Sequence, residues 1–197
     1  MALLPAALSH DPVLVRLAEA VPLPPLDASG DVFHDLVGCL VEQQHPARST
    51  KGTYARLLAR AGIARLTPAD AERFARDALS TARLSAQKRA AVDAAAAAFQ
   101  DDDTDWASLS DDTVRERLVA LPGVGPQTAD NVLLFTLGRP DIFLAGDYHL
   151  KGIMATLYGI APTARAMRDV ADGWRPRRSH AVRLLLAWKT WQREVGR

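Results

Sequence analysis

Hydrophobic residues recur at helical spacing through most of the chain. The first clear example is the set Phe33, Leu36, Val37, Leu40 and Val41, in which apolar positions three and four residues apart form one face of a helix. The same spacing marks residues 50–61, 112–120, 127–137, 148–158, 164–172 and 179–191. No alternation of apolar and polar residues is long enough to indicate a β-strand. The pattern therefore predicts an all-α fold.

Chain length and proline content indicate how these helices are grouped. A chain of 197 residues suits one large domain or two small lobes that share a core. We expect a single unit over the whole chain, with a core lobe at about 31–110 and a second lobe at about 111–197. Residues 1–30 contain five prolines, so we expect only short helices there, packed on the lobes. Asp11 followed by Pro12 is typical of a helix start.

Composition excludes several classes of protein. Hydrophobic residues make up 48% of the chain, but no run approaches the roughly 20 apolar residues that a membrane span needs. The first 15 residues lack the basic segment of a secretion signal, so we expect a cytoplasmic, nucleoid-associated protein and no membrane partner. Cys39 is the only cysteine, which excludes an internal disulfide, and its apolar neighbours predict a buried thiol.

The net charge of +1 hides an uneven distribution of charged residues. Arginines concentrate near the C-terminus, at positions 175, 177, 178, 183 and 193. Aspartates concentrate in residues 101–112, at positions 101, 102, 103, 105, 111 and 112. The arginines are candidates for contact with a polyanion, and the aspartates predict a solvated linker that faces away from it.

The sequence Leu121-Pro122-Gly123-Val124-Gly125 separates two predicted helices, residues 112–120 and 127–137. Two glycines one residue apart between helices predict a tight hairpin whose backbone can approach a ligand closely. Pro126 falls in the first turn of the second helix, where a missing N–H has no cost. The free N–H groups at such a helix start favour an anion, and phosphate is the obvious one.

Asp147 is the candidate reactive group. A helix of eleven residues is roughly 16 Å long, and the loop of residues 139–146 is long enough to return over that distance at about 3.3 Å per residue. Asp147 also precedes a helical pattern, so it is equally a candidate helix cap. The two roles are compatible, because a helix N-terminus favours the ionised carboxylate.

The hairpin sequence LPGVGPQTA, followed at this interval by Phe143-Leu144 and by Asp147-Tyr148, resembles the signature of the helix-hairpin-helix DNA glycosylase superfamily. The similarity covers roughly residues 31–192 and is greatest to the 3-methyladenine DNA glycosylase II group. It implies a two-lobed helical fold with the helix-hairpin-helix motif at 112–137, and Asp147 as the catalytic carboxylate. Several superfamily members carry a four-cysteine iron–sulfur cluster, which the single cysteine here excludes.

The resemblance also implies roles for individual residues. Gln44 matches the position that fills the gap left by an extruded base, and Lys88 matches a lysine that precedes a long helix. Carbonyl groups of the hairpin, here Leu121 and Val124, hold a monovalent Na⁺ or K⁺ ion in some relatives; no other cofactor is expected. The expected DNA-binding residues are Gln44, Lys88, Gly123, Val124, Gly125, Gln127, Thr128 and Arg178. The expected base pocket consists of Phe33, Asn131, Tyr148, Trp174 and Arg177.

The implied activity is that of a monomeric, monofunctional DNA glycosylase acting on damaged double-stranded DNA. Superfamily members that also cleave the strand carry a lysine two residues after the second hairpin glycine, and this chain has Gln127 there. His149 lies two residues beyond Asp147 and is expected to face away from it, which leaves no acid to protonate a departing base. Alkylated bases such as 3-methyladenine are therefore the expected substrates. Release of uracil, mispaired thymine or hypoxanthine is the alternative, and a non-catalytic DNA-binding hairpin is a further one.

Overall fold

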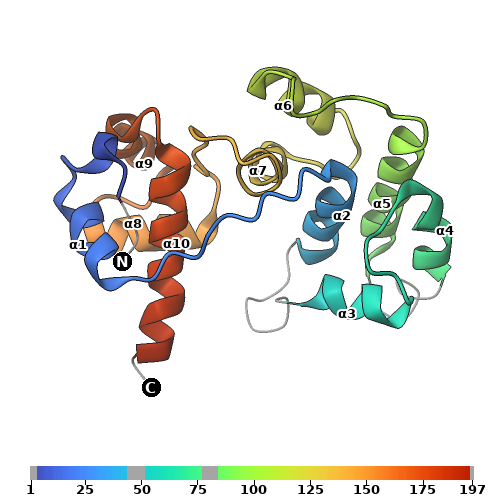
Figure 1. The fold of residues 1–197 in the computed structure, drawn as a ribbon, viewed down its shortest axis with the longest axis horizontal. Coiled ribbons are helices and arrows are strands. Elements are labelled where there is room, and N and C mark those ends of the chain that lie inside the picture. The colour runs from blue at the N-terminus through green and yellow to red at the C-terminus, as the bar shows by residue number, and fades with distance from the viewer. Residues whose placement is uncertain (1–3, 44–51, 77–83, 196–197) are drawn as a thin grey trace. The chain divides into compact units, whose positions relative to one another are not determined.

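The computed structural model describes residues 4–43, 52–76 and 84–195, and within these ranges the secondary structure is helical with no strand (Figure 1). The predicted all-α fold is therefore confirmed for the described residues. No helix in these ranges combines the length and the hydropathy that crossing a bilayer requires. The chain forms two compact units, one of residues Ala28–Leu137 and one in which Met1–Asp27 joins Gly138–Arg197.

The unit of residues 28–137 is built around helix α2. Its helical elements are α2 (Val32–Glu42), α3 (Thr53–Arg60), η2 (Pro68–Asp70), α4 (Ala71–Phe74), α5 (Ala86–Phe99), α6 (Asp111–Val119), α7 (Pro126–Asn131) and the π-helical turn η4 (Val132–Thr136). Helix α2 packs against α5, α3, α7 and η4. The apolar positions predicted for α2 are buried as expected, at Phe33, Leu36, Val37, Leu40 and Val41.

Helix α5 faces α2 with small side chains. Ala91 and Ala95 are buried, and an alanine face lets two helix axes approach closely. Phe33 of α2 packs against Phe99 of α5, with ring centroids 5.6 Å apart and ring planes tilted by 45°. Burial, together with the charges of the nearby Asp35 and Glu42, raises the pKa of the Cys39 thiol to about 12. Cys39 is therefore an inert thiol, although its side chain is half-buried and not fully enclosed.

The other unit joins the N-terminal segment to the C-terminal helices. Its helical elements are η1 (Ala6–Leu8), α1 (Pro12–Ala20), α8 (Tyr148–Tyr158), α9 (Ala164–Ala171), η5 (Asp172–Trp174) and α10 (Arg178–Val195). Helix α10 packs against α8 and α1. Asp11 caps α1 as predicted, accepting hydrogen bonds from Val13 N and Leu14 N through one carboxylate oxygen.

The second carboxylate oxygen of Asp11 connects the N-terminal segment to later helices of this unit. It accepts hydrogen bonds from Trp174 Nε1 at 2.8 Å and from the Tyr158 hydroxyl at 3.0 Å. Trp174 is almost completely buried, at 1% exposed, between this carboxylate and the ring of Phe143. One short N-terminal segment is thereby fixed to residues about 150 positions later in the sequence.

This division differs from the lobe boundary expected at residue 111. Helix α7 and η4 pack on α2, and Gly30 N donates to Thr136 O, so the hairpin region belongs with residues 28–110. Residues 1–27 belong with the C-terminal helices through Asp11. The spacing of residues in the sequence does not predict these long-range contacts, because polar side chains make them and they do not recur at helical intervals.

Candidate active site

Gly123 gives the hairpin its shape and its close packing. Its φ of +78° lies in the left-handed region that favours glycine. A Cβ atom there would lie 2.8 Å from Ala91 Cβ on α5 and 3.7 Å from a methyl group of Leu40 on α2. Gly125 is different, because its φ of −96° suits any residue and nothing lies within 4 Å of its missing Cβ. Gly125 therefore leaves an open approach to the hairpin backbone.

Three N–H groups of the hairpin are available to a ligand. Gly123, Gly125 and Gln127 donate no hydrogen bond through their backbone N–H groups to any residue that the structure describes. Val124 is buried and its N–H donates to Leu121 O, so it offers a ligand little of its own. These three groups match the expected anion site.

Gln43 connects the end of α2 to the hairpin, a role that the sequence did not reveal. Its Nε2 donates to Thr128 Oγ1 at 2.9 Å and to Gly123 O at 3.2 Å. Thr128 is buried, at 7% exposed, so its hydroxyl serves this contact and not DNA as expected. Gln44, the residue expected to fill the gap in the duplex, lies outside the described residues. The only signal for Gln43 was the pair of adjacent glutamines.

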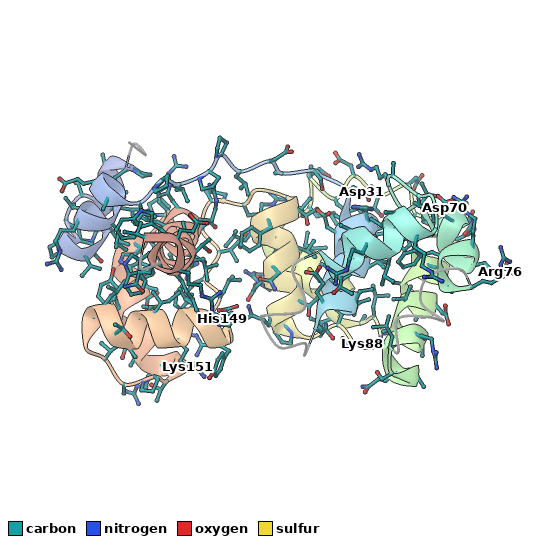
Figure 2. The ribbon with its side chains drawn as sticks, turned by 90° about the horizontal axis from the view of Figure 1, so that it is seen from below. Asp31, Asp70, Arg76, Lys88, His149 and Lys151 are labelled. Atoms are coloured by element: carbon teal, nitrogen blue, oxygen red, sulfur yellow. The ribbon has the colours of Figure 1, made fainter. Side chains whose placement is uncertain are left out.

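Lys88 caps the C-terminal end of α2 (Figure 2). Its Nζ donates to Val41 O at 3.0 Å and also to Gln43 O. A lysine at this position satisfies carbonyl groups that the helix leaves free and complements the helix dipole. Burial lowers the pKa of the ammonium group. The expected phosphate contact is therefore replaced by a structural one that fixes the residue before Gln44.

Gln127 and Asn131 lie on the same short helix, α7. Both side chains are half-buried. The Nε2 atom of Gln127 is buried without a hydrogen-bond partner in the described part of the chain. A buried amide N–H without a partner is costly, so Gln127 Nε2 is poised to donate a hydrogen bond to a ligand.

Asp147 begins helix α8 and uses only one of its two carboxylate oxygens there. Oδ1 accepts from Leu150 N at 2.7 Å, which confirms the predicted cap. Oδ2 has no hydrogen-bond partner among the residues that the structure describes. The side chain is half-buried. A cap thus holds one oxygen while the other remains available.

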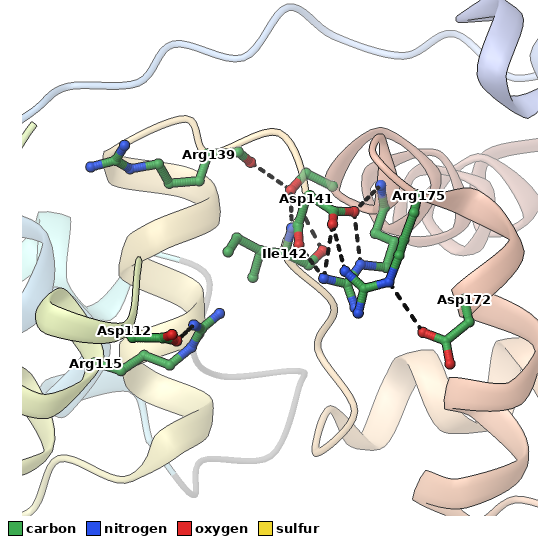
Figure 3. A network of polar contacts seen from close by, with 9 residues as sticks. Asp112, Arg115, Arg139, Asp141, Ile142, Asp172 and Arg175 are labelled. Carbon is green, nitrogen blue, oxygen red and sulfur yellow. Dashed lines mark hydrogen bonds and ion pairs between the residues drawn. The ribbon is translucent and has the colours of Figure 1, made fainter. Parts of the chain in front are cut away.

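The loop that leads to Asp147 is held by the start of α10 (Figure 3). Ser179 Oγ accepts from Ile142 N at 2.9 Å and donates to Arg139 O at 2.6 Å. Arg178 binds both carboxylate oxygens of Asp141, at 2.8 and 3.0 Å, and its carbonyl at 2.6 Å. Nε and Nη2 of Arg178 are thereby engaged by Asp141, which gives Arg178 a role in positioning the loop, and the DNA contact by Arg178 stays a prediction.

A further pair of residues lies next to Asp147. Lys189 of α10 contacts His149 of α8, with Nζ 2.6 Å from Nδ1. Burial lowers the pKa of the Lys189 ammonium and Arg193 lowers it further, whereas the Asp147 carboxylate acts to raise it. The Lys189–His149 contact joins α10 to the first turn of α8. Sequence spacing had missed Lys189, since 42 positions separate it from Asp147.

The residues of the expected base pocket differ in burial, since some are exposed and others lie in a core. Tyr148, adjacent to Asp147, is 83% exposed, and its ring makes an edge contact with the His149 ring at a centroid distance of 5.7 Å. Arg177 is also exposed. Trp174 and Phe33 are 1% and 4% exposed, and each packs in the core of its own unit. Neither can stack on a base without leaving that core, so they are corrected to core residues.

Within the described ranges, no group of three or more histidine, cysteine, aspartate or glutamate side chains comes together as a metal site. Leu121 O accepts a hydrogen bond from Val124 N, and Gly123 O accepts one from Gln43. A carbonyl oxygen has two lone pairs, so the Leu121 carbonyl can still coordinate a cation.

Residues 37–176 match the family described as HhH-GPD superfamily base excision DNA repair protein. This range includes the hairpin and Asp147 and is well over half of the chain, so the protein belongs to this superfamily.

Individual relatives agree with the family assignment. The probable bifunctional transcriptional activator/DNA repair enzyme AlkA of Mycobacterium tuberculosis is 40% identical over 82 residues, which are 42% of this chain and 16% of the relative. The chain thus aligns with about a sixth of that relative's length. The structure of a DNA-3-methyladenine glycosidase from Bacillus halodurans is similar with a TM-score of 0.69 and 26% identity, over 93% of this chain and 86% of that one.

A further solved structure shares the fold. It is the 3-methyladenine DNA glycosylase Mag1 of Schizosaccharomyces pombe in complex with abasic DNA, with a TM-score of 0.75 and 20% identity over 87% of each chain.

Proposed function

We propose that this protein is a DNA glycosylase of base excision repair that hydrolyses the N-glycosidic bond of alkylated bases in double-stranded DNA. The observation that carries the proposal is Asp147, which lies at a helix N-terminus inside the stretch that matches the family and whose Oδ2 has no hydrogen-bond partner in the part of the chain that the structure describes. The names of two relatives support the proposal: the M. tuberculosis protein is called a probable transcriptional activator/DNA repair enzyme, and the B. halodurans protein is called a DNA-3-methyladenine glycosidase.

The hairpin supplies the grip on DNA. N–H groups of Gly123, Gly125 and Gln127 have no partner within the described residues and suit a phosphate oxygen. Contacts to phosphate do not depend on sequence, which is what a protein that searches for damage requires. A monovalent cation at the Leu121 and Val124 carbonyls would add charge to this grip.

The carboxylate of Asp147 supplies the chemistry. A base must first be extruded from the duplex, a step that we assign to Gln44 as the residue that fills the gap. As the glycosidic bond breaks, positive charge develops on the sugar. A carboxylate that is held in place and partly buried stabilises this charge and orients a water molecule for attack at C1′.

The substrates that fit best are purines that already carry positive charge, such as 3-methyladenine and 7-methylguanine. Their glycosidic bonds are weakened before the enzyme acts, so a carboxylate suffices. Tyr148 is exposed beside Asp147, and its ring suits stacking on a cationic base. Because Gln127 is an amide, it cannot form a Schiff base, and the product is an intact strand with an abasic site. The protein acts as a monomer at the nucleoid.

The proposal is tested by incubating the full chain with duplexes that each carry one defined lesion, followed by alkali to cleave at abasic sites. Cleavage after alkali at 3-methyladenine or 7-methylguanine, and no cleavage without alkali, is the expected result. The panel includes uracil and a thymine–guanine mismatch. Faster release of either one would assign the site to neutral pyrimidines. Binding without any release would reduce the protein to a DNA-binding module in which Asp147 only caps α8.

A further inference from the structure

The carboxylate of Asp11 joins the N-terminal segment to two later helical elements of the same unit. It is 8% exposed, and its Oδ1 caps α1. Its Oδ2 accepts from Trp174 Nε1 of η5 at 2.8 Å and from the Tyr158 hydroxyl of α8 at 3.0 Å. Burial and the charge of Asp11 raise the pKa of the Tyr158 hydroxyl, so this group is a donor at neutral pH.

Trp174 connects this carboxylate to the loop that ends at Asp147. Its ring packs edge-on against the ring of Phe143, with centroids 6.0 Å apart and an interplanar angle of 71°. Two short turns follow Phe143. Ala145 N donates to Phe143 O at 3.1 Å, and Asp147 N donates to Leu144 O at 3.0 Å. The backbone between the Phe143 ring and Asp147 is therefore held by hydrogen bonds, and a shift of the ring moves Asp147 with it.

Tyr158 connects the same oxygen to the helix that follows Asp147. It is the last residue of α8, whose first turn Asp147 caps. Its ring also packs on Trp174, with centroids 5.8 Å apart. One oxygen of Asp11 thus holds both the loop before Asp147 and the far end of the helix after it.

We propose that Asp11 is a positioning residue for base release, because its hydrogen bond to Trp174 fixes the loop that places the Asp147 carboxylate. The inference rests on the proposed function, in which Asp147 supplies the chemistry. Stabilisation of charge on the sugar depends on where the carboxylate lies, and a displacement of about 1 Å can cost about 10²-fold in rate. Asp11 acts on the reaction only through the position of Asp147.

Asp11→Ser separates the contact with Trp174 from the helix cap. Serine caps a helix about as well as aspartate, so α1 should remain formed. The serine hydroxyl is attached directly to Cβ and is a single oxygen, so it can serve the α1 N–H groups but leaves Trp174 without its acceptor. A buried N–H without an acceptor is costly, which favours displacement of the indole ring and of Phe143 packed on it.

The test is single-turnover release of 7-methylguanine from a duplex at saturating protein, at a temperature at which each variant is folded by circular dichroism. Asp11→Ser should lower the rate by about tenfold or more. Its affinity for the same duplex should stay within about threefold of wild type, because the hairpin that supplies the phosphate contacts lies in the other unit. A wild-type rate would overturn the inference.

Trp174→Phe tests the other end of the same hydrogen bond and decides the matter if Asp11→Ser does not fold. Phenylalanine keeps an aromatic ring against Phe143 but has no N–H for Asp11, so release should again fall by about tenfold. The double variant should release the base at the rate of the slower single variant, because both changes remove one contact. Losses that multiply would overturn the route through Trp174.

Ala18→Gly is the control for stability alone. Ala18 is a buried residue of α1, and glycine there lowers helix stability and should lower the melting temperature by about 2–4 °C. The rate of release should equal that of wild type. A loss in Ala18→Gly as large as that in Asp11→Ser would overturn the inference, since any weakening of the N-terminal segment would then suffice.

The wild-type protein distinguishes this inference from the proposed function. Release of 7-methylguanine by wild type, with the same rate in Asp11→Ser and in Trp174→Phe, would overturn the inference and leave the proposed function intact. Absence of release by wild type would overturn the proposed function itself.

Discussion

The Gln43 side-chain amide lies 2.9 Å from the Thr128 hydroxyl oxygen, and this contact joins the end of α2 to the second helix of the hairpin. The same amide reaches the carbonyl of Gly123. Gln43 is thus a positioning residue for the hairpin, adjacent in sequence to the residue assigned to gap filling.

Gln43→Ala should weaken binding to damaged and undamaged duplex alike. It removes two hydrogen bonds worth about 1 kcal/mol each, which corresponds to a loss of roughly 5- to 30-fold in affinity at 1.4 kcal/mol for each factor of ten. Fluorescence anisotropy with a labelled duplex measures the effect. Gln100→Ala, an exposed glutamine at the end of α5, is the control. Equal affinities for both variants would show that the hairpin does not depend on Gln43.

The ion pair between Arg178 and Asp141 should make stability depend on acidic pH. Burial alone would raise the pKa of the Asp141 carboxyl, but hydrogen bonds and charge from Arg178, with charge from Arg175, outweigh it and lower the pKa below its ordinary value of 3.8. A lowered pKa in the folded state stabilises the fold above the ordinary pKa, and this contribution is lost as pH falls through the folded pKa.

Asp141→Asn should therefore lower the free energy of unfolding at pH 7 by on the order of 2 kcal/mol, the usual cost of losing hydrogen bonds to a charged group. The difference from wild type should shrink as pH falls below about 4. Urea unfolding at a series of pH values measures both. Asp172→Asn, a more exposed partner of Arg175, should have a much smaller effect. A difference that stays constant down to pH 3 would contradict the assignment.

Affinity for undamaged duplex should fall with salt, by about 0.9 log units per log of salt for each phosphate neutralised by a cationic side chain. Backbone N–H groups of the hairpin carry no charge and add little to this slope. Arg177 is exposed, whereas Arg175 is paired with Asp141 and Asp172. Arg177→Ala should make the slope of log affinity against log salt shallower by about 0.9, the contribution of one phosphate, and Arg175→Ala should leave the slope unchanged. An unchanged slope in Arg177→Ala would remove this arginine from the DNA contact.

Borohydride should trap no covalent adduct between the wild-type protein and an abasic duplex. The reason is that Gln127 occupies the position at which an amine nucleophile would be needed. Gel electrophoresis after reduction measures the adduct. If an adduct forms, Lys189 is the first candidate, because its lowered pKa favours the free amine. Lys151, one turn beyond Asp147 on α8, is the second.

The predictions that agree with the structure rest on interactions between residues close in sequence, and the features that were missed depend on residues far apart in sequence. Helix positions and the caps at Asp11 and Asp147 follow from local spacing and from hydrogen bonds over two or three residues, and they agree with the structure. The hairpin glycines were also identified, although only Gly123 needs a positive φ.

The missed contacts belong to side chains whose partners are distant in sequence. Arg178 and Lys88 are of the residue types that often bind phosphate. In the structure Arg178 donates to Asp141, and Lys88 donates to carbonyl groups at the end of α2. Trp174 is of a residue type that often lines a base pocket. In the structure its indole N–H donates to Asp11, 163 positions away in the sequence, within the core. Lys189 was missed for the same reason, since only the packing of α10 on α8 brings it to His149. Residue type and local spacing do not encode these partners.

The central claim is that the Asp147 carboxylate performs base release, and Asp147→Asn tests it most directly. Asparagine keeps an oxygen that can cap α8, since asparagine and aspartate are comparable caps, so the fold should be retained. Single-turnover release of 7-methylguanine should fall by about 10²-fold or more, because stabilisation of the developing sugar charge is lost. Affinity for the same duplex should stay equal to wild type or increase. An Asp147→Asn variant that releases the base at the wild-type rate would contradict the account and leave Asp147 as a helix cap alone.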